Sequence, residues 1–186
     1  MSEFDEFLKK SRDFHGHLCG GIVLGTRLTL AGLRELGINP REPIRDLIVY
    51  MEIDRCGTDA VQAITGCSLG HRSLKHMDFG KFAATFVNMK TNQAVRVSVQ
   101  EKNREQHMSL DPKDTLKLLS ELPESDLLKI ERVKLSIPKE DQPGLPVGSA
   151  VCSQCGENIS DNRHVVVNGK VLCRNCANGS YYTVIS

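Results

Sequence analysis

The segment CSQCGENISDNRHVVVNGKVLCRNC, from Cys152 to Cys176, carries two Cys-x-x-Cys pairs with the spacing of a zinc ribbon. Two thiolates on one tight turn can face the same ion, so the shell would consist of Cys152, Cys155, Cys173 and Cys176. Asn168-Gly169 is a favoured two-residue hairpin turn, and it returns the chain so that the second pair meets the first. A shell of four thiolates leaves no open position, so we expect a structural zinc and a reactive site elsewhere in the chain.

The alternative for these four cysteines is a pair of disulfides in a small secreted module. Nothing else in the sequence indicates export. The segment 1–10 is acidic and lacks the apolar stretch of a signal peptide, and no run of about 18 apolar residues follows. Gly156, directly after Cys155, suits the positive φ of a zinc knuckle. We therefore expect a cytoplasmic protein with a ribbon zinc and no membrane association.

The charge of the chain argues against binding to nucleic acid. The 186 residues include 24 basic and 23 acidic side chains, a net charge of +1, which cannot attract a polyanion non-specifically. The bases of the ribbon, Arg163, Lys170 and Arg174, are offset by Glu157 and Asp161. A phosphate-binding surface needs more positive charge than this, so we do not expect a nucleic-acid partner.

The sequence divides into a core domain over 1–137, a linker rich in proline and glycine over 138–149, and the ribbon over 150–186. The longest apolar pattern predicts a helix over 20–36. Its three glycines, at 21, 25 and 32, each cost roughly 1 kcal/mol against alanine, so we expect another backbone to approach there. The other predicted elements are helices from Ser2 to just before His15, over 58–65, over 111–121 and from Ser125, and strands over 47–53, 82–89, 94–100 and 129–137.

A second group of metal-ligand residues precedes the glycine-spaced helix. His15, His17 and Cys19 lie within five positions, and neutral imidazole and thiolate are preferred ligands of zinc and later first-row metals. Gly16 permits a bend that turns both imidazoles toward one ion. The alternative is a helix N-terminus with capping histidines and a buried cysteine.

Cys56 follows a predicted strand and precedes a predicted helix. Because a helix N-terminus carries a partial positive charge and Arg55 adds another, we expect a lowered thiol pKa and a reactive thiolate or open-site metal ligand. The alternative is a small buried hydrophobic residue. Cys67 lies about 16 Å further along a regular helix, too far to share a disulfide or an ion with Cys56.

The remaining polar candidates carry weaker signals. Asp78-Phe79-Gly80-Lys81 precedes a predicted strand and offers a carboxylate and an ammonium to a pocket, although a solvated loop is the better explanation of the spacing. His71, His76 and His107 have no partner in the sequence, and we expect them to be surface residues.

Taken together, these segments resemble the FmdE family, which is named for a component of formylmethanofuran dehydrogenase. The resemblance rests on four segments: Phe14-His-Gly-His-Leu-Cys19, Cys56-Gly-Thr-Asp-Ala-Val-Gln62, Thr65-Gly-Cys-Ser-Leu-Gly70 and Asp78-Phe-Gly-Lys81. It covers residues 10–90 by motif and 1–135 by layout, and several members carry a C-terminal zinc ribbon. The sequence departs from the family pattern at His71-Arg72-Ser73, where a lysine-glycine-asparagine-like stretch is expected.

The resemblance implies an α+β fold in which helices pack on a small, mostly antiparallel sheet, commonly as an intertwined homodimer. It also implies a second metal, of unknown identity, near the histidine-glycine-histidine segment, in a setting of anaerobic molybdenum or tungsten metabolism. Carried over to this chain, the metal ligands are His17 and Cys56, with His15 and Cys19 nearby. Asp59, Gln62 and Lys81 would line the site.

Two functions follow as expectations. The first is a metal-dependent enzyme or oxidoreductase subunit acting on a small one-carbon or pterin-linked substrate, with Cys56, His17, Asp59 and Lys81 as catalytic residues. The second is a non-catalytic adaptor or metal-handling protein that docks a molybdenum or tungsten enzyme through its ribbon.

Overall fold

The computed structural model describes residues 2–100 and 111–185, and the chain divides into two compact units, Met1–Leu135 and Ser136–Ser186. Each unit is described by itself. No helix in the described ranges combines the length and the apolar character that a membrane crossing requires. The predicted surface position of His107 lies outside the described residues.

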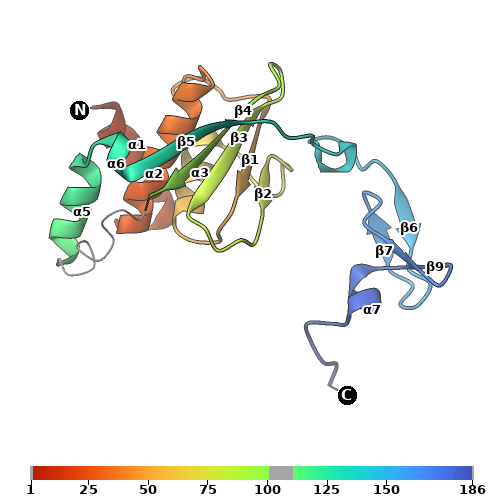
Figure 1. Cartoon of the computed structure of the whole chain (residues 1–186). Helices are drawn as coiled ribbons and strands as arrows, with labels where there is room; N and C mark the ends of the chain where they lie inside the picture. Colours follow the sequence, from red (N-terminus) through yellow and green to blue (C-terminus); the bar gives the residue numbers. More distant parts are fainter. Residues whose placement is uncertain (1, 101–110, 186) are drawn as a thin grey trace. The chain divides into compact units, whose positions relative to one another are not determined.

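The first unit is built on a five-stranded sheet with the strand order β2-β1-β3-β4-β5 (Figure 1). The strands are β1 (Leu47–Met51), β2 (Leu74–His76), β3 (Ala83–Asn88), β4 (Gln93–Val99) and β5 (Leu128–Val133). Only β1 and β2 pair in parallel, whereas the other three pairs are antiparallel. β2 has no signal in the sequence, because three residues are too few for a period-two pattern to stand out. The predicted α+β fold with a mostly antiparallel sheet is confirmed.

Two of the described helices of this unit, the first and the fourth in chain order, begin at side-chain caps that the sequence supplies. The described helices are α1 (Glu3–His15), α2 (Gly20–Glu35), α3 (Gly57–Thr65), α5 (Pro112–Glu121) and α6 (Glu124–Leu127). Ser2 and Asp5 form a reciprocal capping box at the start of α1. Asp111 accepts hydrogen bonds from the backbone N–H groups of Lys113 and Asp114 at the start of α5. These helix predictions are therefore correct to within one or two residues.

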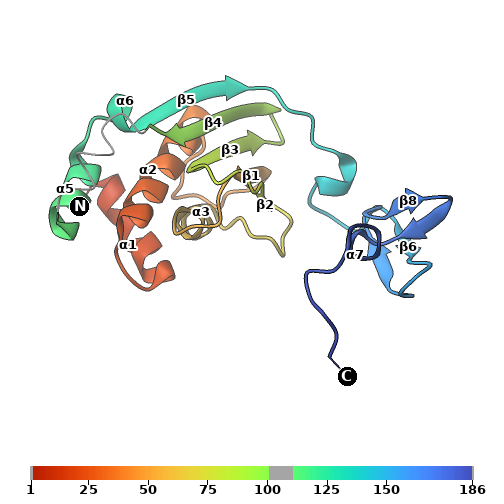
Figure 2. The same ribbon diagram turned by 60° about the horizontal axis from the view of Figure 1, so that its bottom comes forward.

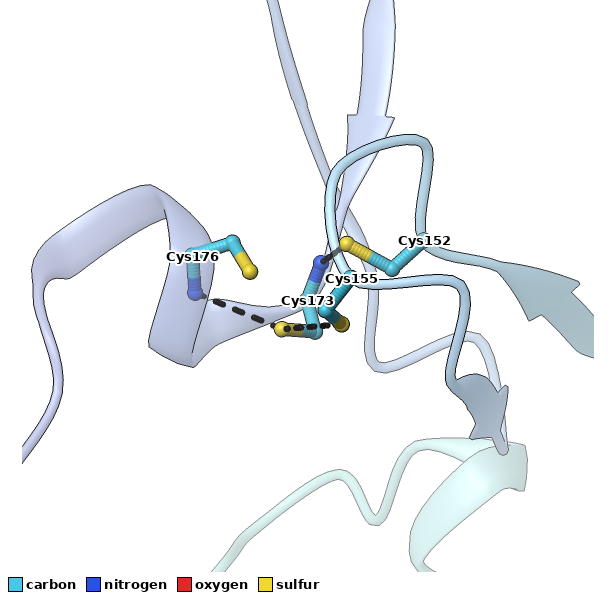
Figure 3. Close-up of side chains that lie close together, drawn as sticks. All are labelled: Cys152, Cys155, Cys173 and Cys176. Atoms are coloured by element: carbon cyan, nitrogen blue, oxygen red, sulfur yellow. Dashed lines mark hydrogen bonds between the residues drawn. The ribbon is translucent and has the colours of Figure 1, made fainter. Parts of the chain in front are cut away.

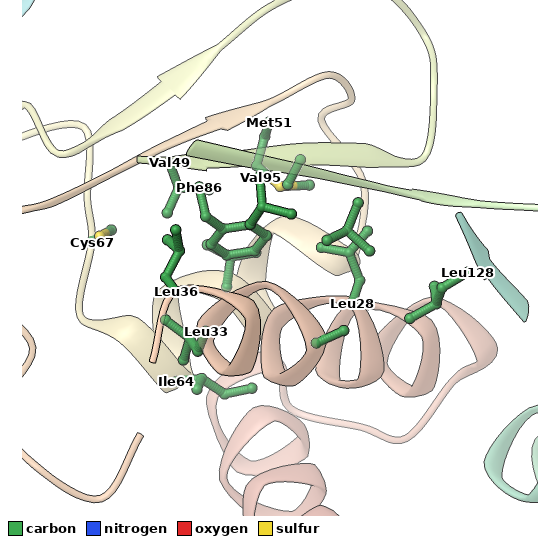
Figure 4. Close-up of a cluster of buried hydrophobic side chains, with 14 of the residues drawn as sticks. Leu28, Leu33, Leu36, Val49, Met51, Ile64, Cys67, Phe86, Val95 and Leu128 are labelled. Atoms are coloured by element: carbon green, nitrogen blue, oxygen red, sulfur yellow. The ribbon is translucent and has the colours of Figure 1, made fainter. Parts of the chain in front are cut away.

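The hydrophobic core lies between one face of the sheet and the helices α1, α2 and α3 (Figure 2). Leu28 and Leu33 of α2 are fully buried against Phe86 of β3 and Val95 of β4 (Figure 4). Burying a side chain of this size stabilises a fold by about 1.5–3 kcal/mol, so this layer holds the unit together without a metal.

Glycines set the distance between α2 and its neighbours. A Cβ on Gly25 would lie 2.6 Å from the Cα of Gly57, so α2 and α3 touch backbone to backbone as the sequence predicts. Gly32 differs, because its neighbour is the ring of Phe86, and the prediction of a second backbone there was wrong. Gly21 faces the side chain of Cys56, with 2.9 Å between its Cβ position and the Cβ of Cys56. The N-terminal halves of α2 and α3 are therefore packed tightly.

The two edges of the sheet are formed by β2 and β5. β2 is three residues long. On β5, at the opposite edge, Lys129 and Glu131 form an ion pair of 2.6 Å. The predicted strand over 129–137 ends at Val133.

The second unit consists of short elements: the 3-10 helix η1 (Lys139–Asp141), the strands β6 (Ser149–Val151), β7 (Asn158–Ser160), β8 (Val165–Val167) and β9 (Lys170–Leu172), and the helix α7 (Arg174–Asn178). Asn168 and Gly169, both with positive φ, join β8 to β9 in the predicted hairpin. Asp141 of η1, in the segment 138–149 that the sequence predicts to be a linker, forms an ion pair with Arg163. Few apolar side chains are buried in the described part of this unit, namely Ile159, Leu172 and Cys152.

Candidate functional site

The four ribbon cysteines converge at one point of the second unit. The Sγ atoms of Cys152, Cys155, Cys173 and Cys176 all lie within 4.8 Å of one another (Figure 3). Cys152 and Cys155 flank the turn after β6, and Cys173 and Cys176 lie at the start of α7. Gly156 has φ of 77°, as the knuckle requires. This arrangement fits a tetrahedral zinc shell filled by protein ligands.

Backbone N–H groups donate hydrogen bonds to the sulfurs of this cluster and favour the thiolate form that binds a cation. The N–H of Cys173 donates to the sulfur of Cys152 over 3.3 Å, and the N–H of Cys176 donates to the sulfur of Cys173 over 3.3 Å. Hydrogen bonds from the backbone N–H groups of Cys155 and Cys173 lower the pKa of Cys152 to about 6. The neighbouring thiol of Cys173 raises the pKa of Cys176 to about 12, because several thiolates repel one another without a metal. A zinc ion would remove that repulsion.

A second cluster forms where α1 ends and α2 begins. One ligand atom each from His15, His17 and Cys19 lies within 4.8 Å of the others. Gly16 ends α1 with φ of 95°, a conformation that L side chains rarely adopt, and this turn brings the two rings to the same side of the chain. The ring centroids lie 4.5 Å apart. The structure therefore brings together three of the four predicted core ligands.

Asp59 fixes the orientation of His15. Its Oδ2 atom lies 2.7 Å from Nδ1 of His15, across the packing of α3 on α1. A carboxylate in this position holds the proton on Nδ1 and leaves a lone pair on Nε2. Nε2 is buried and has no hydrogen-bond partner among the described residues. A buried ring nitrogen with no partner in the described part of the chain, beside an imidazole and a thiol, has the chemistry of a metal ligand.

Cys56 lies beside this cluster but outside the group of three. Gly21 has no Cβ atom. If one were added, the sulfur of Cys56 and the sulfur of Cys19 would both lie within 3.8 Å of it. Burial raises the pKa of Cys56, and the adjacent Cys19 thiol raises it further. The predicted lowering of this pKa was wrong, because desolvation and a neighbouring thiol outweigh the start of a short helix and the exposed Arg55.

The other candidates lie apart from this chemistry. Lys81 is exposed on the loop before β3, and its backbone N–H donates to the carbonyl of Glu52 over 3.1 Å. Cys67 is buried in the core, and burial raises its thiol pKa. His71 and His76 are exposed, as predicted. His71 lies 3.0 Å from the hydroxyl of Ser68 within its own turn.

An apolar cavity of about 180 Å³ lies along α3. Met51, Ile53 and Leu74 form apolar walls, and Gln62 belongs to its lining. Gln62 also donates from Nε2 to Oδ1 of Asp59 over 3.3 Å, so one side chain connects the cavity to the partner of His15. No sequence pattern indicated this cavity, because its apolar walls have the pattern of ordinary core residues; Gln62 was expected in the lining of the metal site.

Two family models match the chain. The model described as "FmdE, Molybdenum formylmethanofuran dehydrogenase operon" covers residues 14–135, and that described as "Prokaryotic dksA/traR C4-type zinc finger" covers residues 146–182. The second match falls on the four-cysteine cluster, and we call residues 146–182 the zinc finger from here on.

Two similar proteins add context. A protein of Archaeoglobus fulgidus named "Probable S-adenosyl-L-methionine-binding protein" is 32% identical over 212 aligned residues, and the match covers all of this chain but 56% of that relative. A tungsten formylmethanofuran dehydrogenase FmdE-like protein from Syntrophus aciditrophicus has a crystal structure with the same fold. Its TM-score is 0.66 at 24% identity, over 97% of this chain and 95% of the other. Because the first family model covers most of the described core unit, this chain belongs to the FmdE family and carries a C4-type zinc finger at its C-terminal end.

Proposed function

We propose that the core unit binds a divalent transition metal through His15, His17 and Cys19, and that this centre serves one-carbon metabolism of the formylmethanofuran dehydrogenase type. The observation that carries the proposal is the orientation of His15: Asp59 holds Nδ1, and Nε2 is buried without a partner among the described residues. An unpaired buried acceptor costs about 1–3 kcal/mol, and a metal ion would compensate that cost.

The donor set fits a zinc-like ion. Two imidazoles and one thiolate suit zinc and other late first-row metals, and three protein ligands are typical of a catalytic site. When bound, such an ion supplies a Lewis acid that polarises a carbonyl or lowers the pKa of a bound water. We assign His17 and Cys19 as ligands, Asp59 as the residue that positions His15, and Cys56 as a neighbour that supplies a further sulfur. Lys81, on its exposed loop, would reach only the outer part of a bound substrate.

The cavity beside α3 supports a small organic ligand near this centre. Its walls are apolar, and Gln62 links it to Asp59. The name of the Archaeoglobus relative makes S-adenosylmethionine the first compound to test, and a one-carbon carrier with a planar ring is the second. An apolar pocket of this kind suits the flat ring of either compound.

A non-catalytic adaptor is the second candidate function, and exposed apolar side chains in the second unit favour it. Val166 on β8 is 64% exposed, and Tyr181 and Ile185 after α7 are more than 90% exposed. Exposed apolar groups of this size suit a protein partner, which in this family would be a molybdenum or tungsten enzyme. We further propose a homodimer in the cytoplasm, where free thiols remain reduced.

Metal analysis of the purified chain tests the core site. We expect two ions per chain in the wild type and one in the variants His17→Ala and Cys19→Ala, because the zinc finger keeps its own ion. The matched control is His71→Ala, which removes an exposed histidine outside the cluster and should keep both ions. Two ions in either cluster variant would show that the residues are wrongly assigned.

Turnover separates the two functions. A metal-dependent enzyme should act alone on its substrate and lose activity with His17→Ala. An adaptor should show no turnover alone and should copurify with a partner that is lost when Val166 and Tyr181 are changed to serine.

A further inference from the structure

The geometry points to a reversible disulfide between Cys19 and Cys56, which we propose as an oxidation site that withdraws Cys19 from the core cluster. The disulfide itself follows from the packing of α2 and α3. Its effect on a metal rests on the proposed function.

Both cysteines lie at the starts of two helices that touch. Cys19 is the N-cap residue of α2, and Cys56 is the N-cap residue of α3. The backbone contact between Gly25 and Gly57 brings the N-terminal parts of these helices close together. A Cβ atom added to Gly21 would lie 3.4 Å from Sγ of Cys56 and 3.8 Å from Sγ of Cys19. Gly21 therefore leaves the space in which the two sulfurs can join.

The two thiols are also accessible. Neither side chain makes a capping hydrogen bond to its helix. Both residues are partly exposed, whereas Cys67 is 4% exposed and packed in the core. Small oxidants thus reach Cys19 and Cys56 and do not reach Cys67.

The reaction balances with a low-molecular-weight disulfide as oxidant. One protein thiolate attacks the small disulfide, forms a mixed disulfide and releases one small thiol. The second protein thiolate attacks the protein sulfur of that mixed disulfide and releases the second small thiol. The two protein sulfurs are oxidised, the small disulfide is reduced, and the two protons pass to the released thiols. Because a disulfide sulfur has no thiolate charge, Cys19 then no longer serves as a metal ligand.

Peptide mapping of the full chain tests the bond. The protein, with zinc in the finger, is treated with glutathione disulfide, its remaining thiols are alkylated, and it is cut with trypsin. We expect a linked pair joining peptide 13–27 to peptide 56–72, in the wild type and equally in Cys67→Ala, which leaves Cys56 as the only cysteine of its peptide. Mixed disulfides without a linked pair, or a linked pair that persists in Cys56→Ala, would overturn the assignment.

Two neighbouring glycine variants test the geometry without removing a thiol. In Gly21→Ala the new Cβ would lie 2.9 Å from the Cβ of Cys56, so Cys56 must shift and the linked fraction should fall several-fold. In Gly20→Ala the nearest atom is the flexible Cδ1 of Leu119 at 3.3 Å, and the linked fraction should equal that of the wild type. Thermal unfolding confirms that both variants are folded. If Gly21→Ala does not fold, Cys19→Ala replaces it and should abolish the linked pair. Equal linkage in Gly20→Ala and Gly21→Ala would count against the proposal.

Cobalt binding separates this inference from the proposed function. Co²⁺ added to the reduced chain, with zinc in the finger and no metal in the core, should give a cobalt–thiolate absorption from Cys19, which glutathione disulfide abolishes and a phosphine reductant restores. A linked pair with unchanged cobalt absorption would refute the withdrawal of Cys19. A linked pair in a chain that never binds cobalt would contradict the proposed metal centre and leave the disulfide established.

Discussion

The zinc finger and the histidine-cysteine cluster of the core differ in what holds their ligands in place. In the finger, the turns that carry the four cysteines have almost no hydrophobic core beneath them, and backbone N–H groups point at the sulfurs. In the core, His15 is oriented by Asp59 from another helix, and both helices rest on a packed hydrophobic layer.

This difference indicates opposite relations between metal and fold. Ile159 and Leu172 bury too little surface to offset the entropy of ordering the finger, so its fold depends on zinc. The core cluster is held by helices that fold without a metal. A ligand set of three residues on a preformed scaffold suits an exchangeable or reactive ion, whereas a set of four suits a permanent one.

Removing one finger ligand should have the largest effect. We expect Cys173→Ala to abolish zinc binding and unfold residues 136–186, a loss on the order of 10 kcal/mol of metal-linked folding energy. Amide NMR spectra should show the loss of dispersion in this unit alone, and zinc content should fall by one ion. Cys67→Ala is the control, because it removes a thiol of the core and should keep the finger zinc. A folded finger in zinc-free Cys173→Ala would contradict this account.

A methyl group at the contact of α2 with α3 should have the next largest effect, and it should spare the finger. In Gly25→Ala the Cβ would meet the backbone of Gly57, which cannot turn aside, so we expect the core to lose about 3 kcal/mol of unfolding free energy. Gly70→Ala is the matched control, since a Cβ there meets no atom within 4 Å. Urea denaturation of both variants gives the difference, and a wild-type stability for Gly25→Ala would refute the close contact.

The sequence predicted those parts of the structure that local chemistry decides. Ser2, Asp111 and the Asn168-Gly169 turn act on their own neighbours, so the elements that they begin or join were placed correctly. The finger was equally predictable, because its spacing is local and its ligands are chemically distinctive.

Specific side-chain contacts between distant segments of the core were not predicted from the sequence. The contact between Asp59 and His15 joins residues 44 positions apart, and no sequence pattern in either segment indicates it. The pKa of Cys56 was predicted in the wrong direction for the same reason, since the direction depends on burial and on Cys19 from another helix. The aromatic neighbour of Gly32 likewise comes from the packing of α2 on β3.

The contact of Asp59 with His15 can be removed without changing a proposed metal ligand. Asp59→Asn keeps the shape of the side chain but removes the charge that holds the proton on Nδ1, so metal affinity of the core should fall by about 10–100-fold. Competition with a chromogenic chelator measures the change. Asp54→Asn is the control, because Asp54 is an exposed carboxylate close by in sequence, and it should bind metal like the wild type. Equal affinities for the two variants would remove Asp59 from the site.

Acid should affect the finger before the core. The pKa of Cys152 is lowered from 9.0 to about 6, so the stabilising thiolate is fully present above 9 and is lost as the pH falls through about 6. Protons also compete with zinc for the thiolates. Zinc release, followed with a dye as the pH is lowered, should therefore occur while the core remains folded. Release that coincides with unfolding of the core would show that the two regions are not independent.

The smallest effect concerns a carboxylate of the core. The guanidinium of Arg34, 2.6 Å away, lowers the pKa of Glu124 below its ordinary value of 4.5. The stability it adds is present above 4.5 and is lost as the pH falls below that value. Because both groups are partly exposed, we expect Glu124→Gln to cost at most about 1 kcal/mol near neutral pH and nothing in strong acid. Urea midpoints across this range measure it, and a pH-independent difference would argue against the ion pair.

The edges of the five-stranded sheet bear on how a stored sample of this protein would deteriorate. Aggregation into fibres begins when the free edge of one sheet accepts a strand from another molecule. One edge here offers only the three residues of β2, and the other presents Lys129 and Glu131, which an incoming strand would have to desolvate. Fibre growth should therefore not start at the core sheet. Loss of zinc is the more dangerous event, because it unfolds the finger beside the apolar residues Val184 and Ile185, which are exposed already. Zinc in the storage buffer should then protect a concentrated sample better than any change to the core.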